Sequence, residues 1–129
     1  MADLIMQRVV SIILIAVGLM NFYPAIGVLS AVTLSGLYGI ELMDGDILLL
    51  MRHRAVLFGI LGGFLIVSAF RRQWQSPVIA AGFVSMAAFV ALTAVAGEPG
   101  DPIRRIAAAD LAGCIALVAV CVIRRRATR

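Results

Sequence analysis

Four long apolar runs dominate this chain and leave few residues for any other structure. They lie at about 4–22, 46–70, 77–96 and 103–123. Because about 20 apolar residues in a helix cross a hydrocarbon core of roughly 30 Å, each run is long enough to span a membrane. The chain is 63% hydrophobic and 14% charged, whereas a soluble domain is roughly 45–50% apolar and about 25% charged. We therefore predict an all-α integral membrane bundle of four transmembrane helices, one transmembrane domain over 1–129.

The segment between the first two runs is apolar but is interrupted by glycine, serine and threonine. Pro24 ends the first run, because proline cannot continue a helix without losing a hydrogen bond. Residues 25–45 are suited to a short helix that lies on or dips into the membrane interface. The alternative is a fifth span from Ile26 to Leu42, which would reverse the orientation of every later helix. We favour four spans with a short interfacial helix between the first and the second.

The basic residues indicate an orientation. All 11 are arginine, against 7 acidic residues. Most of them would share one side of the membrane: Arg8, Arg71, Arg72, Arg124, Arg125, Arg126 and Arg129. Since basic residues are enriched in cytoplasmic loops, we predict that both termini are cytoplasmic, in a bacterial inner membrane. The same distribution explains the net charge of +4 without nucleic acid as a partner.

The stretch Arg52-His53-Arg54 places charges inside the second apolar run. If Asp46 is the N-cap of that helix, Arg54 lies about eight residues in, or roughly 12 Å along the axis. A guanidinium at that depth must reach the interface, pair with an acid or line a wet cavity. Arg52 and Arg54 differ by about 200° around the helix and therefore point to different faces.

Asp110 is the predicted partner of these arginines. It lies one to two turns into the fourth run, which starts on the same side of the membrane as the second, so its depth matches theirs. An unpaired carboxylate there would cost about 2.5–3.5 kcal/mol. We therefore predict that Asp110 pairs with Arg54 or Arg52 across the bundle. Further charges near the same side would extend this network: Arg104, Arg105, Glu41, Asp44 and Asp101.

Two interpretations of the charges around Arg54 remain open. In the first, which we favour, a charge network fixes the register of the helices. In the second, an outward-facing polar pocket binds an anionic headgroup through the arginines, and His53 or Asp110 moves a proton. Arginine suits phosphate and carboxylate groups, histidine titrates near neutral pH, and intramembrane ionisable groups are functional candidates in general.

Other chemistry has little support in the sequence. A single histidine and the absence of a Cys-x-x-Cys motif argue against a metal site. Cys114 and Cys121 are interpreted as small buried hydrophobic residues, not as a disulfide. No nucleophile elbow, phosphate loop or dinucleotide fingerprint is present. We predict no cofactor, and we favour a protein without enzymatic activity while leaving an enzyme open as the alternative.

Small residues recur at spacings that allow helices to approach closely. Gly59 and Gly63 form a G-x-x-x-G motif, and Ala108, Ala112 and Ala116 repeat at intervals of four. These stripes favour a protein that associates with itself or serves as an accessory or scaffold subunit of a larger membrane complex, surrounded by membrane lipid. The alternative is a membrane-embedded enzyme or a binder of anionic lipid or small molecules that uses Arg52, His53, Arg54 and Asp110. A third possibility is an oligomeric transporter.

The stretch Leu48–Gly62, which contains LLMRHRAVLFG, and more weakly Ile103–Leu111 resemble a known group of sequences. These are small four-span bacterial membrane proteins of unknown function, sometimes labelled phosphopantetheine adenylyltransferases. That label requires a soluble nucleotide-binding fold with an H-x-G-H motif, and this sequence has neither. The resemblance implies that Arg52, His53, Arg54 and Asp110 are signature residues of the group, and it implies no activity.

Overall fold

A computed structural model describes residues 1–41 and 45–127, and these ranges contain helices and no strand. The helices are α1 (Ala2–Phe22), the 3₁₀ helix η1 (Tyr23–Leu29), α2 (Ala31–Tyr38), α3 (Gly45–Ser68), α4 (Arg72–Val95) and α5 (Asp101–Ala127). Counted with η1, α1 is one of four helices that are long and apolar enough to cross a membrane. The predicted all-α bundle of four spans is confirmed, and its features are those of a multi-pass membrane protein.

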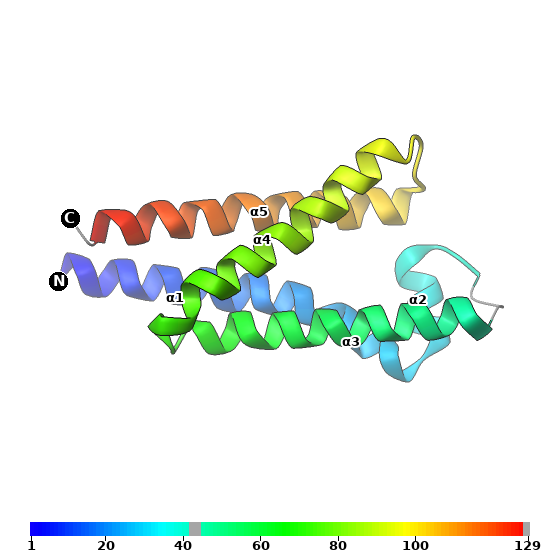
Figure 1. Ribbon diagram of the computed structural model, residues 1–129, viewed down its shortest axis with the longest axis horizontal. Coiled ribbons are helices and arrows are strands. Elements are labelled where there is room, and N and C mark those ends of the chain that lie inside the picture. The colour runs from blue at the N-terminus through cyan, green and yellow to red at the C-terminus, as the bar shows by residue number, and fades with distance from the viewer. Residues whose placement is uncertain (42–44, 128–129) are drawn as a thin grey trace.

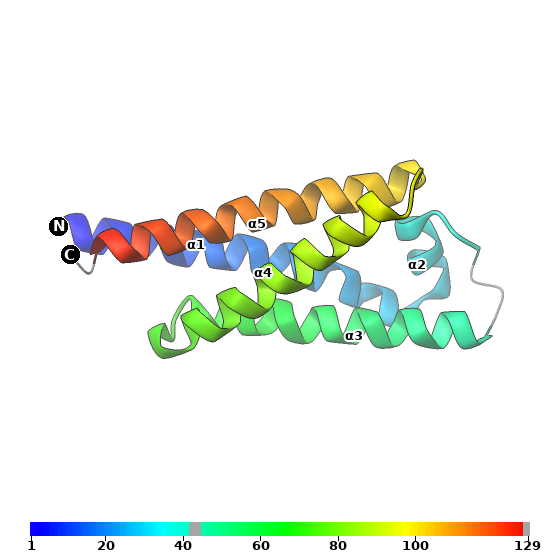
Figure 2. The same ribbon diagram turned by 45° about the horizontal axis from the view of Figure 1, so that its top comes forward.

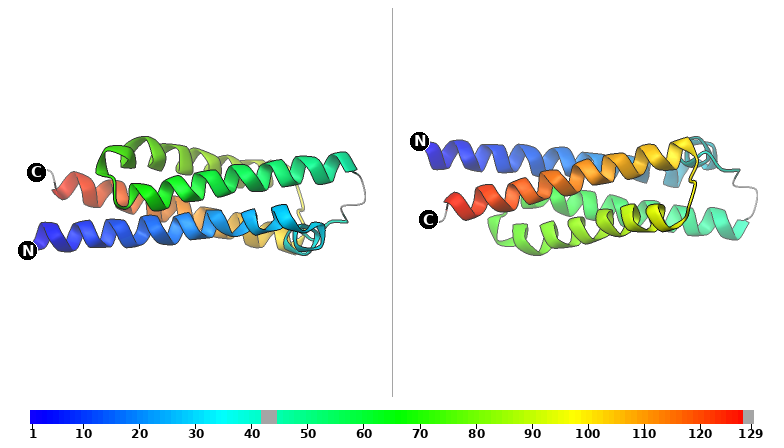
Figure 3. Two further views of the ribbon diagram at one scale, coloured as in Figure 1. Left: turned by 90° about the horizontal axis from the view of Figure 1, so that it is seen from below. Right: turned by 90° about the horizontal axis from the view of Figure 1, so that it is seen from above.

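The helices form an elongated bundle with two distinct ends. Figure 1 shows α4 crossing the bundle obliquely, from the end of α3 to the start of α5. Both termini and the α3–α4 turn lie at one end, here called the terminal end (Figure 2). η1, α2, the start of α3 and the α4–α5 turn lie at the other, here called the α2 end, as the views from below and above confirm (Figure 3).

The connector after the first span forms the short helix that the sequence predicts. α2 has eight residues, or about 12 Å of helix, which is less than half of a hydrocarbon core of roughly 30 Å. The Ser30 side chain accepts a 3.3 Å hydrogen bond from the backbone N–H of Thr33 and caps its start. Gly39 ends it in the left-handed conformation, with φ 65°. A fifth span in this segment is therefore excluded.

The third span begins earlier than the sequence predicts. Pro77 was expected to start it, but α4 begins at Arg72 and contains Pro77. Gln75 lies in the first turn, and its side-chain amide donates a 3.1 Å hydrogen bond to the carbonyl of Ser68 at the end of α3. This buried contact holds the segment in helical geometry, while Pro77 removes only one backbone hydrogen bond near the helix start.

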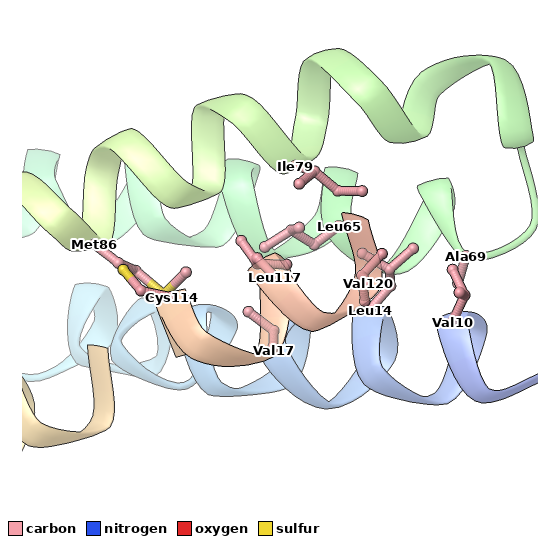
Figure 4. Close-up of a cluster of buried hydrophobic side chains, with 10 residues drawn as sticks. All are labelled: Val10, Leu14, Val17, Leu65, Ala69, Ile79, Met86, Cys114, Leu117 and Val120. Carbon is pink, nitrogen blue, oxygen red and sulfur yellow. The ribbon is translucent and has the colours of Figure 1, made fainter. Parts of the chain in front are cut away.

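The largest core cluster joins α1, α3, α4 and α5. Figure 4 shows its side chains meeting between these helices, with Leu14, Leu65, Met86 and Leu117 fully buried. A second cluster at the α2 end packs Leu34, Tyr38 and Ala55 together. Large apolar side chains also cover the outside: Ile12, Val84 and Ile115 are each more than 60% exposed. An outer surface of this kind is suited to lipid.

The backbones of α1 and α3 approach each other closely at Gly18 and Gly62. A Cβ atom added at Gly62 would lie 2.5 Å from the carbonyl oxygen of Gly18 and 2.7 Å from the backbone nitrogen of Phe22. Only the first glycine of the predicted G-x-x-x-G motif packs closely within this chain. A Cβ atom added at Gly59 would lie 3.0 Å from the Cβ of Ala25, whereas one added at Gly63 would meet open space.

The alanine stripe of α5 is not part of the packing face within this chain. Ala108 and Ala112 are exposed, and the buried face of α5 runs instead through Asp110, Gly113 and Leu117. Both cysteines are free: Cys114 is buried, as the sequence predicts, and Cys121 is partly buried.

Candidate functional site

Arg54 lies against three aromatic rings from three helices. Its guanidinium carbon is 5.5 Å from the ring centre of Tyr38 in α2, 5.1 Å from that of Phe58 in α3 and 4.8 Å from that of Phe89 in α4. A cation within about 6 Å of a ring centre is attracted to the negative face of the ring. The three rings therefore stabilise the guanidinium and link α2, α3 and α4 around it.

Asp110 supplies the negative charge from the fourth helix, α5. It is 8% exposed and close enough to Arg54 for their charges to interact. Arg54 follows Gly45 by nine residues and Asp110 follows Asp101 by nine, so both lie roughly 14 Å from the starts of their helices. The matched depth of the two residues agrees with the sequence analysis.

The contact ion pair predicted for Asp110 is absent from the part of the chain that the structure describes. A direct ion pair does form between Arg104 and Asp101, at the surface of the same end. Aromatic rings occupy the near surroundings of the Arg54 guanidinium in place of a carboxylate. We call Arg54, Tyr38, Phe58, Phe89 and Asp110 the Arg54 cluster.

Tyr38 covers the Arg54 cluster from the α2 end. Its side chain is 4% exposed and packs with Leu34 and Ala55. Burial raises the pKa of its hydroxyl above the ordinary value of 10.0; the charge of Arg54 acts against this rise and that of Asp110 adds to it. The phenol is therefore neutral at physiological pH, and the charges of the cluster belong to Arg54 and Asp110.

Arg52 and His53 do not join the cluster. His53 is exposed and points away from the buried faces of α3. Arg52 is partly buried, and its Nε atom is buried with no hydrogen-bond partner among the described residues. Successive helical residues differ by about 100° in direction, so the three neighbours that the sequence groups together face three different surroundings.

The outer charges stay at the surface of the α2 end. Arg104 and Asp101 form an ion pair within the first turn of α5, with side chains 66% and 74% exposed, and such pairs contribute at most about 1 kcal/mol. Arg105 and Glu41 are exposed. Asp46 is also exposed and lies in the first turn of α3, not at its N-cap; Asp44, the other predicted member, lies outside the described residues.

Sequence reasoning missed the aromatic members of the cluster. Phe58 follows Arg54 by four residues, one helical turn, so its position was available from helical spacing alone. Tyr38 and Phe89 reach Arg54 only through the folding back of α2 and the oblique path of α4 (Figure 1). No local pattern in the sequence indicates either contact.

Comparison of this chain with protein-family models, curated proteins and solved structures gives no match. The resemblance to small four-span bacterial membrane proteins stays a prediction. Among the described residues, no three side chains of the metal-ligating types histidine, cysteine, aspartate and glutamate come together. The features that remain as candidates for function are the Arg54 cluster and the surfaces of the bundle.

Proposed function

We propose that this chain is a non-catalytic structural protein of a bacterial inner membrane, which associates with itself or serves as a subunit of a larger membrane complex. One observation carries the proposal. The guanidinium of Arg54, a partly buried residue, already lies against Tyr38, Phe58 and Phe89 and interacts with the charge of Asp110. Arg54 therefore interacts with residues of its own chain, and these interactions join α2, α3, α4 and α5.

The charges at the two ends support a cytoplasmic position for both termini. Six arginines lie at the terminal end: Arg8, Arg71, Arg72, Arg124, Arg125 and Arg126. The α2 end carries Arg104 and Arg105 together with Glu41, Glu98 and Asp101. Basic residues favour the cytoplasmic side of bacterial membranes, so this asymmetry supports the proposal that the terminal end faces the cytoplasm.

The outer face of α5 supports association. Ala108 and Ala112 are exposed and one helical turn apart, and they take no part in the packing face of their own chain. Helices in lipid associate largely through close packing of small residues, because no hydrophobic effect drives them together. A second helix, from another copy or another protein, can approach α5 closely at this face.

The mass of the purified protein tests this proposal. We expect the full chain in mild detergent to migrate as a multiple of its 13.7 kDa, or with a co-purified partner. Ala112→Leu adds bulk to the exposed face of α5 and should weaken the association, whereas Ala91→Leu, at an exposed position of α4, should not. A mass of one chain plus micelle, with no partner, would contradict the proposal.

Arg52 favours a second candidate function, the binding of an anionic headgroup or small molecule near the α2 end. Its buried Nε atom has no partner among the described residues, and an unsatisfied buried donor is costly unless something accepts from it. This function predicts that Arg52→Gln leaves the protein folded and associated but removes a co-purified anionic ligand. A structural role for Arg52 predicts instead that thermal stability falls and that no ligand is lost.

A further inference from the structure

A groove of about 710 Å³ lies between α4 and α5 in the half of the bundle nearest the terminal end. Its walls are apolar, formed by Ile79, Phe83 and Val84 of α4 and by Leu117, Val118 and Val122 of α5. Its volume lies within the range of about 300–1,000 Å³ that is usual for small-molecule sites. The groove is therefore large enough to hold part of a lipid.

The polar part of the groove lies at its terminal end. Ser76, Arg124 and Arg125 line it there. The Arg124 Nη2 atom donates a 3.0 Å hydrogen bond to the hydroxyl of Ser76, which joins α5 to α4 across the end of the groove. Figures 1 and 2 show α4 diverging from α5 toward this end. The groove thus combines an apolar channel with two guanidinium groups at one end.

We propose that this groove binds one phospholipid with an anionic headgroup, with an acyl chain along the apolar walls and the phosphate at Arg124 and Arg125. The distribution of charge along the groove carries the proposal. The apolar walls face the hydrocarbon, while both arginines lie near the end of α5, where a phosphate layer meets the helix. Guanidinium groups bind phosphate oxygens in bidentate pairs, and basic pockets between transmembrane helices are known sites for anionic headgroups.

A second copy of the chain suits the groove less well than a lipid. A parallel copy packed along it would bring its own run Arg124-Arg125-Arg126 beside the same run of the first chain. Repulsion between these like charges opposes such a contact, whereas an anionic lipid neutralises them. The groove also lies apart from the Arg54 cluster, and no residue of that cluster lines it. This inference therefore does not depend on the proposed function.

Lipid binding to the full chain in mild detergent tests the inference. Native mass spectrometry would measure the retention of phosphatidylglycerol against phosphatidylcholine with the same acyl chains. We expect one phosphatidylglycerol to bind in preference to phosphatidylcholine. Each arginine near a lipid surface contributes on the order of a fivefold change in affinity. Arg125→Gln should therefore weaken binding roughly fivefold and Arg124→Gln with Arg125→Gln roughly 25-fold.

Two further variants separate the groove from general attraction to the surface. Arg8→Gln with Arg126→Gln removes the same charge from the terminal end, but neither residue lines the groove, so binding should fall much less than in the double variant of Arg124 and Arg125. Ala80 lines the groove and is exposed, and Ala80→Trp should fill it and displace the lipid. An unchanged melting temperature would show that each variant is folded.

Three results would overturn the inference. If the Arg8→Gln with Arg126→Gln control lost as much phosphatidylglycerol as the Arg124→Gln with Arg125→Gln variant, any positive charge at this end would be sufficient to bind the lipid. Retention of the lipid by Ala80→Trp would place it elsewhere. If Ala80→Trp changed the number of chains in the oligomer without changing the bound lipid, the occupant of the groove would be a second copy of the chain. Arg125→Gln keeps the bond from Arg124 to Ser76, so it decides the question even if the double variant unfolds.

Discussion

Arg54 and Asp110 show how this bundle holds opposite charges without a contact ion pair. The guanidinium lies over three rings, the nearest centred 4.8 Å away, and Asp110 acts on it from beyond direct contact. A cation–π contact that is shielded from water contributes about 2 kcal/mol. Arg54 therefore has favourable surroundings that do not depend on Asp110 alone, whereas buried Asp110 depends on the charge of Arg54.

This asymmetry predicts unequal effects of removing the two charges. Arg54→Leu leaves Asp110 buried without an opposite charge and should cost about 3–5 kcal/mol of folding free energy. Asp110→Leu should cost less, because Arg54 keeps its three rings. The double variant should recover much of the loss, because no charge then stays buried alone. Unfolding by sodium dodecyl sulfate, in the same mild detergent, measures all three.

Arg104→Leu provides the control for this series. Arg104 forms an exposed pair with Asp101, and surface pairs contribute about 0–1 kcal/mol. A double variant no more stable than Arg54→Leu alone would contradict the assigned role of the Arg54 cluster.

The sequence predicts the depth of these charges but not their surroundings. The matched positions of Arg54 and Asp110 follow from helix geometry and from the side on which each span starts. The identity of the groups around Arg54 depends on α2 folding back over α3, which places Tyr38 there, and on the angle at which α4 crosses, which places Phe89. Packing of whole helices sets both, and packing leaves no periodic signal in the sequence.

The crossing of α1 and α3 is a close contact between two backbones. Gly18 and Gly62 let the two backbones approach so closely that a single methyl group at Gly62 would meet backbone atoms of α1 at 2.5 and 2.7 Å. Backbone atoms cannot move aside as the end of a flexible side chain can. The relative position of the first two spans therefore depends on glycine, which has no Cβ atom, at both positions.

A matched pair of glycines tests this crossing. Gly62→Ala should destabilise the protein by about 1–3 kcal/mol, because the added methyl group must push α1 and α3 apart. Gly63→Ala, one residue along α3, meets open space and should stabilise the helix by up to about 1 kcal/mol. Thermal unfolding followed by circular dichroism compares them, and equal effects would show that the crossing is looser than described.

The elements could be predicted well where burial in lipid dictates them. Apolar runs of spanning length required four helices, and α2 followed from glycines and serines too frequent for a fifth span. The start of α4 was missed because the bond from Gln75 to Ser68 is a tertiary contact. The choice of Gly62 over Gly63 was missed because the direction of α1 relative to α3 decides which glycine faces it.

The arrangement of the two ends of the molecule requires an even number of spans. With four, both termini and the α3–α4 turn share one end (Figure 3), and α3 and α5 start at the other, which brings Arg54 and Asp110 to the same height. An additional span between α3 and α5 would separate these two residues across the membrane, and an additional span before α3 would bring the two termini to opposite sides. The Arg54 cluster, the proposed structural role and the arginines at the terminal end all require the same topology.

Labelling of single cysteines in intact cells tests this topology most directly. In a background with Cys114→Ala and Cys121→Ala, the introduced residues would be Ala2→Cys, Gln73→Cys and Ala127→Cys at the terminal end, and Ile40→Cys and Glu98→Cys at the α2 end. We expect a membrane-impermeant maleimide to label the α2-end positions in intact cells and the terminal-end positions only after lysis. Labelling of position 2 and position 127 from opposite sides of the membrane would contradict the account.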